Sequence, residues 1–279
     1  MMNLLAASDL VKLYGSGRAQ VRAVDGVSLE LRPGELVLVM GPSGSGKTTL
    51  LSMLGGLLRP TSGSVKVGGA DLGALGERDL ARVRARQIGF VFQAFNLLAS
   101  LTVEENVLFP ARLVGGQKGA RARAETLLRQ LGLVERRRAL PRSLSGGEKQ
   151  RVAIARALIN DAPVILADEP TGNLDSERGQ EVVMILHDLA RDEGRAVLIV
   201  THDPRVEDVA DRILWLEDGV LRDHHPSEKV WTRDPVCGMR VDAKSTAFVI
   251  EQSGGKRLAF CSEGCLQRFR TRPQAYPAA

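Results

Sequence analysis

The chain has 279 residues, enough for one large domain or two unequal ones, and its 44% hydrophobic and 25% charged residues are typical of a globular protein. Its net charge is +5, and most of it lies in residues 231–279, which hold eight Lys and Arg and four Asp and Glu. The first 230 residues hold 30 Lys and Arg and 29 Asp and Glu, so this main body is near neutral. A near-neutral body argues against a large nucleic-acid-binding surface. No apolar run approaches the roughly 18 residues of a membrane span, and the N-terminus lacks a basic segment followed by an apolar core, so we expect neither a spanning helix nor a secretory signal.

Short apolar runs separated by turns open the chain. Residues 10–14 and 23–31 are expected to be strands, and Pro33 and Gly34 turn the chain into a third apolar run, Leu36–Met40. Tyr14, one of only two tyrosines, ends the first strand. Its position alone leaves two interpretations open, a half-buried strand tyrosine or an aromatic face on which a base could stack.

The sequence Gly41-Pro42-Ser43-Gly44-Ser45-Gly46-Lys47-Thr48 fits the phosphate-binding pattern G-x-x-x-x-G-K-[ST]. It follows the apolar run Leu36–Met40 and precedes a segment, Thr49–Leu54, that can be helical. Backbone N–H groups of such a loop close around phosphate oxygens, and the helix N-terminus adds its positive dipole end. Lys47 can reach the β- and γ-phosphates and Thr48 can bind Mg²⁺. A plain glycine turn before a helix is disfavoured because the full motif stands in its strand–loop–helix context.

The middle of the chain alternates strands and helices. After a break at 59–63, we expect short strands at Val65–Val67 and Ile88–Phe92, with Gln93 at the end of the second. Gln93 could reach a metal or its water, or could lie on the surface. Residues 97–140 look helical, with a capping-box pattern from Thr102 to Glu105. The apolar side chains between positions 95 and 109 are either a partner surface or ordinary helical core, and core is favoured for most.

A second glycine-rich helix start follows at Leu144-Ser145-Gly146-Gly147-Glu148. Ser145 and Glu148 fit the capping box S-x-x-E, which predicts a helix to about Ile159. Two adjacent glycines in a first helical turn are costly, so we expect something to approach the backbone closely there. A second phosphate at this helix N-terminus would explain them.

Two later apolar runs end in polar residues. Val164–Ala167 leads to Asp168 and Glu169, which places two carboxylates at a strand end, where open α/β sheets bind ligands. Asp168 can hold Mg²⁺ and Glu169 can polarise an attacking water. The alternative, a strand followed by an acidic turn, is disfavoured by the phosphate loop, because Mg²⁺–ATP needs such a carboxylate.

The second run, Ala196–Val200, leads to Thr201-His202-Asp203. His202 could contact the γ-phosphate and orient water, or could be structural. Residues 213–216 and 220–221 fit a closing hairpin.

Together these residues resemble the ATP-binding subunit of an ABC transporter over about residues 3–223, because five separated motifs occur in that family's order. The phosphate loop is Gly41–Thr48, Gln93 matches the Q-loop, Leu144–Glu148 the signature, Val164–Glu169 Walker B and His202 the switch histidine. Tyr14 matches the aromatic that stacks on adenine, and Asp175 falls at the D-loop. The resemblance implies an α/β fold with a mixed core sheet, an antiparallel β subdomain and a helical subdomain at about 94–160, all within a domain of residues 1–223.

The resemblance also implies the site and its cofactors, ATP and Mg²⁺. Glu169 would be the general base or water-orienting carboxylate, acting with His202 and Lys47. The residues that would contact ATP are Tyr14, Gly41, Ser43, Gly44, Ser45, Gly46, Lys47, Thr48, Thr49 and Gln93. Mg²⁺ would be held at Thr48, Gln93 and Asp168. A second copy of the chain would contribute Ser145, Gly146, Gly147 and Asp175 in trans, so that a head-to-tail homodimer encloses two ATP molecules.

The run Asp168–Ser176 looks most like the branch of lipoprotein-releasing, macrolide-exporting and cell-division ATPases. Such subunits power a separate membrane permease and lie peripherally on the cytoplasmic face of the inner membrane. The surface around Gln93–Phe109 would then transmit dimer motion to the permease. A soluble, non-transport ABC ATPase and a metal-sensing regulatory ATPase are the alternatives. The former usually carries a coiled-coil insertion or tandem cassettes, and neither is present in this sequence.

Residues 224–231 form a polar linker to a second domain at 232–279. The segments Asp234–Met239 and Phe260–Cys265 resemble a YHS domain, a small module that often accompanies heavy-metal transport proteins. Leu258-Ala259-Phe260 occupies the place where that family has tyrosine-rich residues before its second cysteine, so the aromatic part of the resemblance is weaker. We expect a small α+β module there. Its basic charge could meet an acidic partner or anionic lipid, but a solvated basic face is favoured.

All three cysteines, Cys237, Cys261 and Cys265, lie in this tail. An odd, clustered set without a signal segment indicates free thiols or a metal site more than a disulfide framework. Cys261 and Cys265 would share one face if both lay on a helix. With Cys237 they could form a three-thiolate site for a heavy metal such as Cu(I) or Zn²⁺. Reduced cysteines packing a small core are the alternative.

Overall fold

The computed structural model describes residues 3–116, 119–224, 231–236, 240–243, 246–251, 257–271 and 273–276. The chain divides into two compact units, Met1–His224 and His225–Ala279. None of the helices in these described ranges has the length and apolar character that a membrane span requires.

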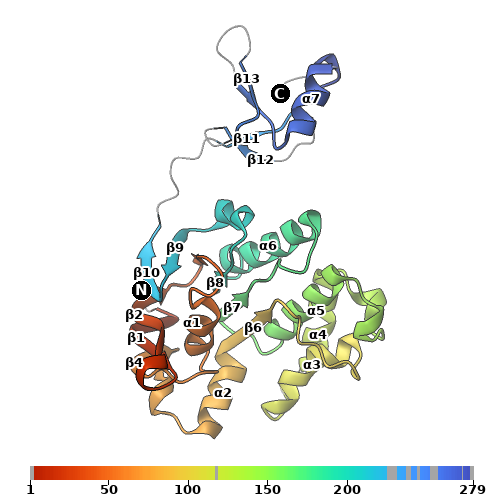
Figure 1. The fold of residues 1–279 in the computed structure, drawn as a ribbon. Helices are drawn as coiled ribbons and strands as arrows, with labels where there is room; N and C mark the ends of the chain where they lie inside the picture. The colour runs from red at the N-terminus through yellow and green to blue at the C-terminus, as the bar shows by residue number, and fades with distance from the viewer. Residues whose placement is uncertain are drawn as a thin grey trace. The chain divides into compact units, whose positions relative to one another are not determined.

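A six-stranded mixed sheet forms the centre of the first unit (Figure 1). Its order is β10 (Val220–Asp223), β9 (Arg212–Glu217), β3 (Leu36–Met40), β8 (Ala196–Val200), β7 (Val164–Asp168) and β6 (Ile88–Phe92). All neighbours are parallel except β9 and β10, which form the predicted hairpin. The central strands are continuous apolar runs because both faces of the sheet are covered, and every residue of β3 and β8 is buried.

An antiparallel sheet of order β2 (Val21–Leu31), β1 (Leu5–Tyr14), β4 (Ser62–Val67) and β5 (Ala70–Asp71) packs with helix α1 (Lys47–Leu54) into one apolar cluster with the core sheet. The mixed core and this second sheet confirm the predicted fold. Strand β1 starts five residues before the predicted strand. A register shift between Ala7 and Leu10, with Asp9 at φ +49°, interrupts its alternating pattern and hid its first half.

Helices α3 (Val103–Leu113), α4 (Ala120–Gln130) and α5 (Gly146–Leu158) gather on the opposite side of the unit and share a second apolar cluster with the core sheet (Figure 1). Helix α6 (Ser176–Arg191) joins β7 to β8. Helix α2 (Glu77–Gln87) was not predicted. It is strongly charged and buries only Leu80, so no apolar stripe marks it in the sequence.

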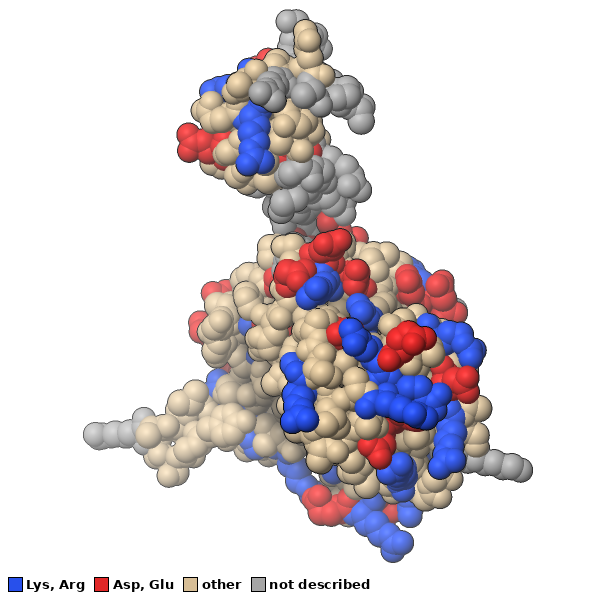
Figure 2. Space-filling view, turned by 90° about the vertical axis from the view of Figure 1, so that its right-hand side faces the viewer, with Lys and Arg blue, Asp and Glu red and all other residues tan. Residues whose placement is uncertain are grey.

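Figure 2 shows the face that carries helices α3–α5, where basic and acidic side chains are interspersed. Several of them form ion pairs, among them Arg129–Glu125, Arg137–Glu104 and Arg151–Glu181. Because these pairs are largely exposed, each contributes little to stability and mainly balances charge locally.

The second unit is built from short strands and one helix, as the predicted α+β module requires. The strands pair as β11 (Trp231–Arg233) with β12 (Arg240–Asp242) and β13 (Val249–Glu251) with β14 (Arg257–Ala259), and α7 spans Glu263–Thr271. Phe260 is fully buried and packs with Leu258, Cys265, Leu266 and Phe269. Of the predicted linker, residues 225–230 lie outside the described ranges, and Trp231 already belongs to β11.

The segment between β6 and α3 is held by one buried amide. Thr102 caps α3 in the predicted capping box with Glu105. One turn in, Asn106 is 1% exposed, accepts from the Leu98 N–H at 2.8 Å and donates to the carbonyls of Leu98, Leu101 and Thr102. The amide therefore ties the loop to the first turn of α3: it pairs with the Leu98 N–H and the Leu101 carbonyl, and it adds to the backbone bonds that the Leu98 and Thr102 carbonyls already accept.

Replacing Asn106 with leucine, which has a similar shape, removes the hydrogen bonds of the amide, including those to the Leu98 N–H and the Leu101 carbonyl. We expect Asn106→Leu to lower the free energy of unfolding by about 2 kcal/mol or more. Denaturant unfolding of the full chain measures the change. Glu125→Ala, which breaks the exposed pair with Arg129, is the control and should change stability by less than about 0.5 kcal/mol. Equal, small effects of the two substitutions would show that Asn106 does not hold the loop.

Candidate active site

The predicted phosphate loop joins β3 to α1 and is squeezed between two backbone segments. A Cβ on Gly41 would lie 2.0 Å from the Leu216 carbonyl oxygen, and one on Gly46 would lie 2.1 Å from that of Ala23. Both positions require glycine. Gly44, at φ +83°, has no atom within 4 Å of where its Cβ would be among the described residues, so this part of the loop stays open.

The loop borders a cavity of about 300 Å³ lined by Ala23, Ser43, Gly44, Gly46, Lys47, Thr48, Thr49 and Glu169. The Lys47 ammonium is buried and donates to the carbonyls of Gly41 (2.8 Å) and Pro42 (2.9 Å). The buried Ser45 hydroxyl has no hydrogen-bond partner within the described part of the chain. An orphaned hydroxyl, a buried cation and the first turn of α1 gather hydrogen-bond donors at this loop, and they fit a nucleotide's phosphate oxygens.

Oxygen ligands stand beside this cavity. The Thr48 hydroxyl donates to Asp168 Oδ1 at 3.2 Å, at the end of β7. Burial raises the pKa of the Asp168 carboxyl, the Thr48 hydrogen bond opposes the shift, and the neighbouring Glu169 charge adds to it. A carboxylate that is costly to ionise here favours a bound cation, and hydroxyl and carboxylate oxygens suit Mg²⁺.

Glu169 is held by three consecutive residues, the last of β8 and the two that follow it. Its N–H donates to the Val200 carbonyl at 2.8 Å, the Thr201 hydroxyl donates to Oε2 at 2.7 Å, and His202 Nδ1 lies 2.7 Å from Oε1. The Glu169 backbone has φ +44°, the left-handed region that costs a non-glycine residue about 1–2 kcal/mol. The structure thus places Lys47, Thr48, Asp168, Glu169 and His202 around one edge of the sheet.

Two predicted residues lie outside this cluster. Neither Tyr14 nor Gln93 lines the cavity. Tyr14 is 43% exposed, with Lys12 Nζ 5.5 Å from its ring centroid. The Gln93 side chain packs against Gly172, and the Gln93 backbone carbonyl accepts from the Asn173 side-chain amide at 2.8 Å.

The signature segment forms a separate site. Ser145 caps α5 in the predicted capping box with Glu148, and Asp175 caps α6 through the Arg178 N–H. A Cβ on Gly146 would lie 3.2 Å from Leu174, and one on Gly147 would lie 3.1 Å from Arg178. Part of the expected close approach to these glycines therefore comes from the chain's own D-loop region.

A cavity of about 520 Å³ at this site is lined by Arg136, Ser145, Glu148, Arg151, Glu177, Arg178 and Glu181. It shares no residue with the cavity at the phosphate loop.

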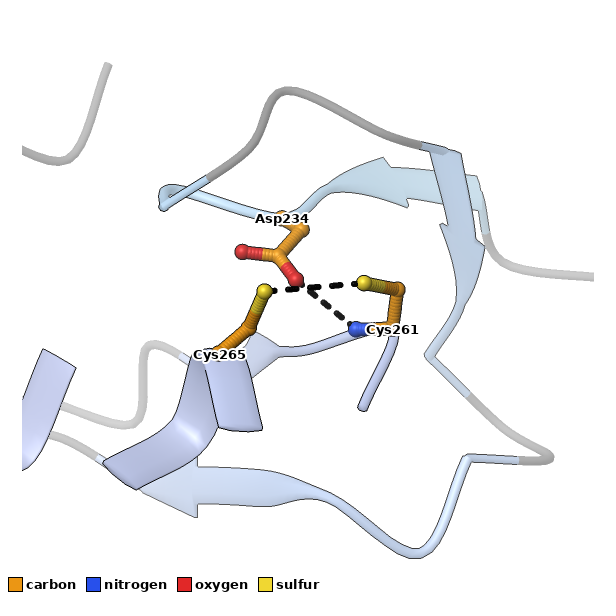
Figure 3. Close-up of side chains that lie close together, drawn as sticks. All are labelled: Asp234, Cys261 and Cys265. Carbon is orange, nitrogen blue, oxygen red and sulfur yellow. Dashed lines mark hydrogen bonds between the residues drawn. The ribbon is translucent and has the colours of Figure 1, made fainter. Parts of the chain in front are cut away.

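The second unit holds a cluster of possible metal ligands (Figure 3). The ligand atoms of Asp234, Cys261 and Cys265 lie within 4.8 Å of one another, and the two sulfurs are 3.7 Å apart. Cys237 lies outside the described residues. A helix does not carry both other cysteines, because α7 begins at Glu263, after Cys261. Buried Asp234 was missed as a ligand; its place three residues before Cys237 was the available signal.

Asp234 is held as a carboxylate. Burial raises the pKa of its carboxyl, but hydrogen bonds from the N–H groups of Cys261 and Val236 (2.8 Å each) and from the two thiols outweigh it and leave the pKa below its usual range. The carboxylate points toward both sulfurs (Figure 3). Two thiols and one ionised carboxylate fit a borderline metal ion.

Comparison with known proteins gives the family. The model of the ABC transporter family matches residues 24–172, just over half of the chain. An uncharacterized ABC transporter ATP-binding protein of Mycobacterium bovis is 48% identical over 230 residues, which are 82% of this chain and 69% of that protein. The chain belongs to the ABC transporter family. The dimeric ATP-binding cassette MJ0796, solved in a post-hydrolysis state with ADP and Pi, superposes with a TM-score of 0.72 at 39% identity, over 80% of this chain and all of that one. The chain is therefore an ATP-hydrolysing enzyme.

Other matches add detail. The macrolide export ATP-binding/permease protein MacB of Shigella sonnei is 47% identical over 232 residues. The chain spans about a third of MacB, since the match covers 36% of that protein's length. The YHS domain model matches residues 232–279 of the second unit.

The capping box at the signature predicts a pH-dependent stability. The Ser145 N–H holds the pKa of the Glu148 carboxyl below its usual value, burial opposes the shift, and the Ser145 hydroxyl and Arg136 add to the lowering. The folded chain therefore keeps Glu148 ionised more readily than the unfolded chain does. This stabilisation is present at neutral pH and is lost as the pH falls below about 4.3 toward the lowered pKa.

We expect thermal unfolding to show a smaller loss of Tm between pH 6 and about pH 3.5 for Glu148→Gln than for the natural chain. Glutamine keeps the acceptor for the Ser145 N–H but does not titrate. Glu125→Gln, at an exposed pair on α4, is the control and should leave the pH dependence unchanged. Identical acid profiles for Glu148→Gln and the natural chain would contradict the assignment.

Proposed function

We propose that this chain is the ATPase subunit of a transporter, which dimerises head-to-tail around two Mg²⁺–ATP and drives a separate membrane permease from the cytoplasmic face of the inner membrane. The observation that carries the proposal is the cluster at the strand ends, where Glu169 and His202 stand beside the phosphate loop and the Thr48–Asp168 pair. The name of MacB, which joins ATP-binding and permease parts, supports a permease partner.

In this proposal each residue has a defined role. Lys47, Ser45 and the loop N–H groups would bind the phosphates, and Thr48 and Asp168 would hold Mg²⁺, which would supply positive charge to the phosphates. Gln93 would complete the metal site by turning away from Gly172, and the exposed ring of Tyr14 would stack on adenine. Glu169 accepts a proton from the attacking water while His202 leaves Glu169 for the γ-phosphate.

The separation of the two cavities supports a composite site made by two copies. Ser145 lines a cavity that shares no residue with the cavity at the phosphate loop. Gly146 and Gly147 follow Ser145 in the first turn of α5, and Asp175 caps α6 beside them. A second copy, placed head-to-tail, would bring its signature to the first copy's phosphates, as a helix N-terminus suits an anion. The MJ0796 cassette was solved as a dimer, which supports a dimer for this chain.

A groove beside Gln93 is proposed to receive a cytoplasmic helix of the permease. It has a volume of about 430 Å³ and lies between α2, β6, α3 and α5, with Phe90, Phe92 and Leu113 in its lining. Phe95 and Asn96, which follow Gln93, have positive φ angles, and Arg156 in the lining donates to both of their carbonyls. Phe95 and Asn96 thus form a strained segment that Arg156 holds from inside the groove. A helix that moves in the groove could shift this segment and, through it, Gln93.

We further propose that the second unit binds a heavy metal through Cys261, Cys265 and Asp234, with Cys237 as a further ligand. The carboxylate favours Zn²⁺ over Cu(I), because Cu(I) prefers soft thiolates alone. Metal bound there would regulate the ATPase or belong to its cargo pathway. A metal-sensing regulatory ATPase is the second candidate function, because the cluster of Asp234, Cys261 and Cys265 supports it as well as it supports a transport subunit.

The general-base role predicts the behaviour of Glu169→Gln in the full chain. The variant should bind Mg²⁺–ATP with an affinity within about threefold of normal, lose turnover by about 100-fold or more, and accumulate as an ATP-bound dimer. Steady-state hydrolysis, nucleotide binding and size-exclusion chromatography with ATP measure the three effects. Near-normal hydrolysis would remove Glu169 from this role. Glu125→Gln, at the exposed pair with Arg129 on α4, is the control for a lost carboxylate and should still hydrolyse ATP.

Metal analysis of the full chain purified under reducing conditions tests the second unit. We expect about one equivalent of Zn²⁺, lost in Cys261→Ser/Cys265→Ser and kept in Glu263→Gln, whose carboxylate is exposed between them. A chain without bound metal, whose thermal unfolding is unchanged by chelation, would favour cysteines that only pack a core.

A further inference from the structure

We propose that Thr201 is a positioning residue for ATP hydrolysis, which fixes one oxygen of Glu169 so that the other can take the proton of the attacking water. The proposal rests on the general-base role of Glu169 given above. Its structural basis is a buried hydroxyl, 2.7 Å from Glu169 Oε2, on a residue that is 0% exposed.

The direction of the Thr201 hydroxyl is set by its surroundings. The Asp203 N–H donates to Thr201 Oγ1 at 3.0 Å, which occupies a lone pair of that oxygen. The hydroxyl proton is then available for Glu169, whose carboxylate can only accept. Thr201 is therefore an aligned donor to the base, and not merely its neighbour.

Thr201 is also rigidly placed. Its own N–H donates to the Val39 carbonyl of β3 at 3.1 Å, at the centre of the core sheet. The register of β7 with β8 places Asp168 opposite Val200, so Glu169 meets the residues that leave β8. The short Thr201 side chain therefore connects the core sheet directly to the Glu169 carboxylate, without a flexible segment between the sheet and the carboxylate.

The two Glu169 oxygens are held differently. Oε2 is bound by buried Thr201, whereas Oε1 is 2.7 Å from Nδ1 of His202, whose side chain is 64% exposed. When His202 moves to a γ-phosphate, Oε1 loses its partner and Oε2 keeps its own. The carboxylate then stays oriented, in an otherwise strained backbone at φ +44°, with one oxygen free to accept a proton.

The test is a kinetic comparison of Thr201→Val with Thr201→Ser in the full chain. Valine keeps the shape without the donor, so we expect kcat to fall by about tenfold to 100-fold, with the KM for ATP within about twofold of normal. Serine keeps the donor and should restore kcat to within about threefold. Thr171→Val is the matched control, because the buried Thr171 hydroxyl donates to Asp203 Oδ2 at 3.1 Å and not to Glu169. It should leave kcat within about twofold of normal.

Three outcomes would overturn the proposal. They are a normal kcat in Thr201→Val, a serine variant as slow as the valine variant, and a Thr171→Val variant that is equally slow. Glu169→Gln, assayed in parallel, separates this failure from that of the proposed function. If Glu169→Gln is inactive and Thr201→Val is normal, only the positioning role fails. If Glu169→Gln hydrolyses ATP normally, the general-base role itself is wrong.

Discussion

The parallel register of β3, β8 and β7 is the constraint on which the candidate active site depends. It brings the ends of three strands to one edge of the sheet, where the chain leaves toward the phosphate loop, Thr201 and Glu169. Each strand is apolar on both faces, and this burial fixes it in place. The polar residues beyond the strand ends therefore meet at hydrogen-bonding distance although they are far apart in the sequence.

The phosphate loop and the Glu169 turn keep backbone conformations that a free chain would avoid. Gly41 and Gly46 lie so close to the carbonyls of Leu216 and Ala23 that no side chain fits, and Glu169 itself has a positive φ. At Glu169 the strain is balanced by its hydrogen bonds to residues at the end of β8, whereas at the loop glycine itself removes the strain. Donors and acidic ligands are thus aligned before a nucleotide binds, which is how preorganised sites stabilise charge.

The second unit has a small apolar core and depends in addition on the hydrogen bonds of one buried carboxylate. It has a small core around Phe260, and its buried Asp234 accepts hydrogen bonds from two backbone N–H groups and two thiols. A module of about 50 residues has little apolar surface to bury, so such a polar cluster ties together segments that a larger core would join by packing. Metal binding would add to this link, because the ligands already face one another.

Much of this protein was determined by local sequence. Regular apolar runs predicted the core strands, and the capping boxes at Thr102 and Ser145 predicted the starts of two helices. Both features could be predicted because they depend on residues only a few positions apart. The charged helix α2 and the first half of β1 escaped prediction, since one lacks an apolar stripe and the other is interrupted by a bulge.

Only the tertiary structure paired Thr201 with Glu169, placed Asp234 beside two cysteines and set Gly147 of the signature against Arg178. Those contacts depend on strand order and register, which bring distant segments together and which no short stretch of sequence encodes.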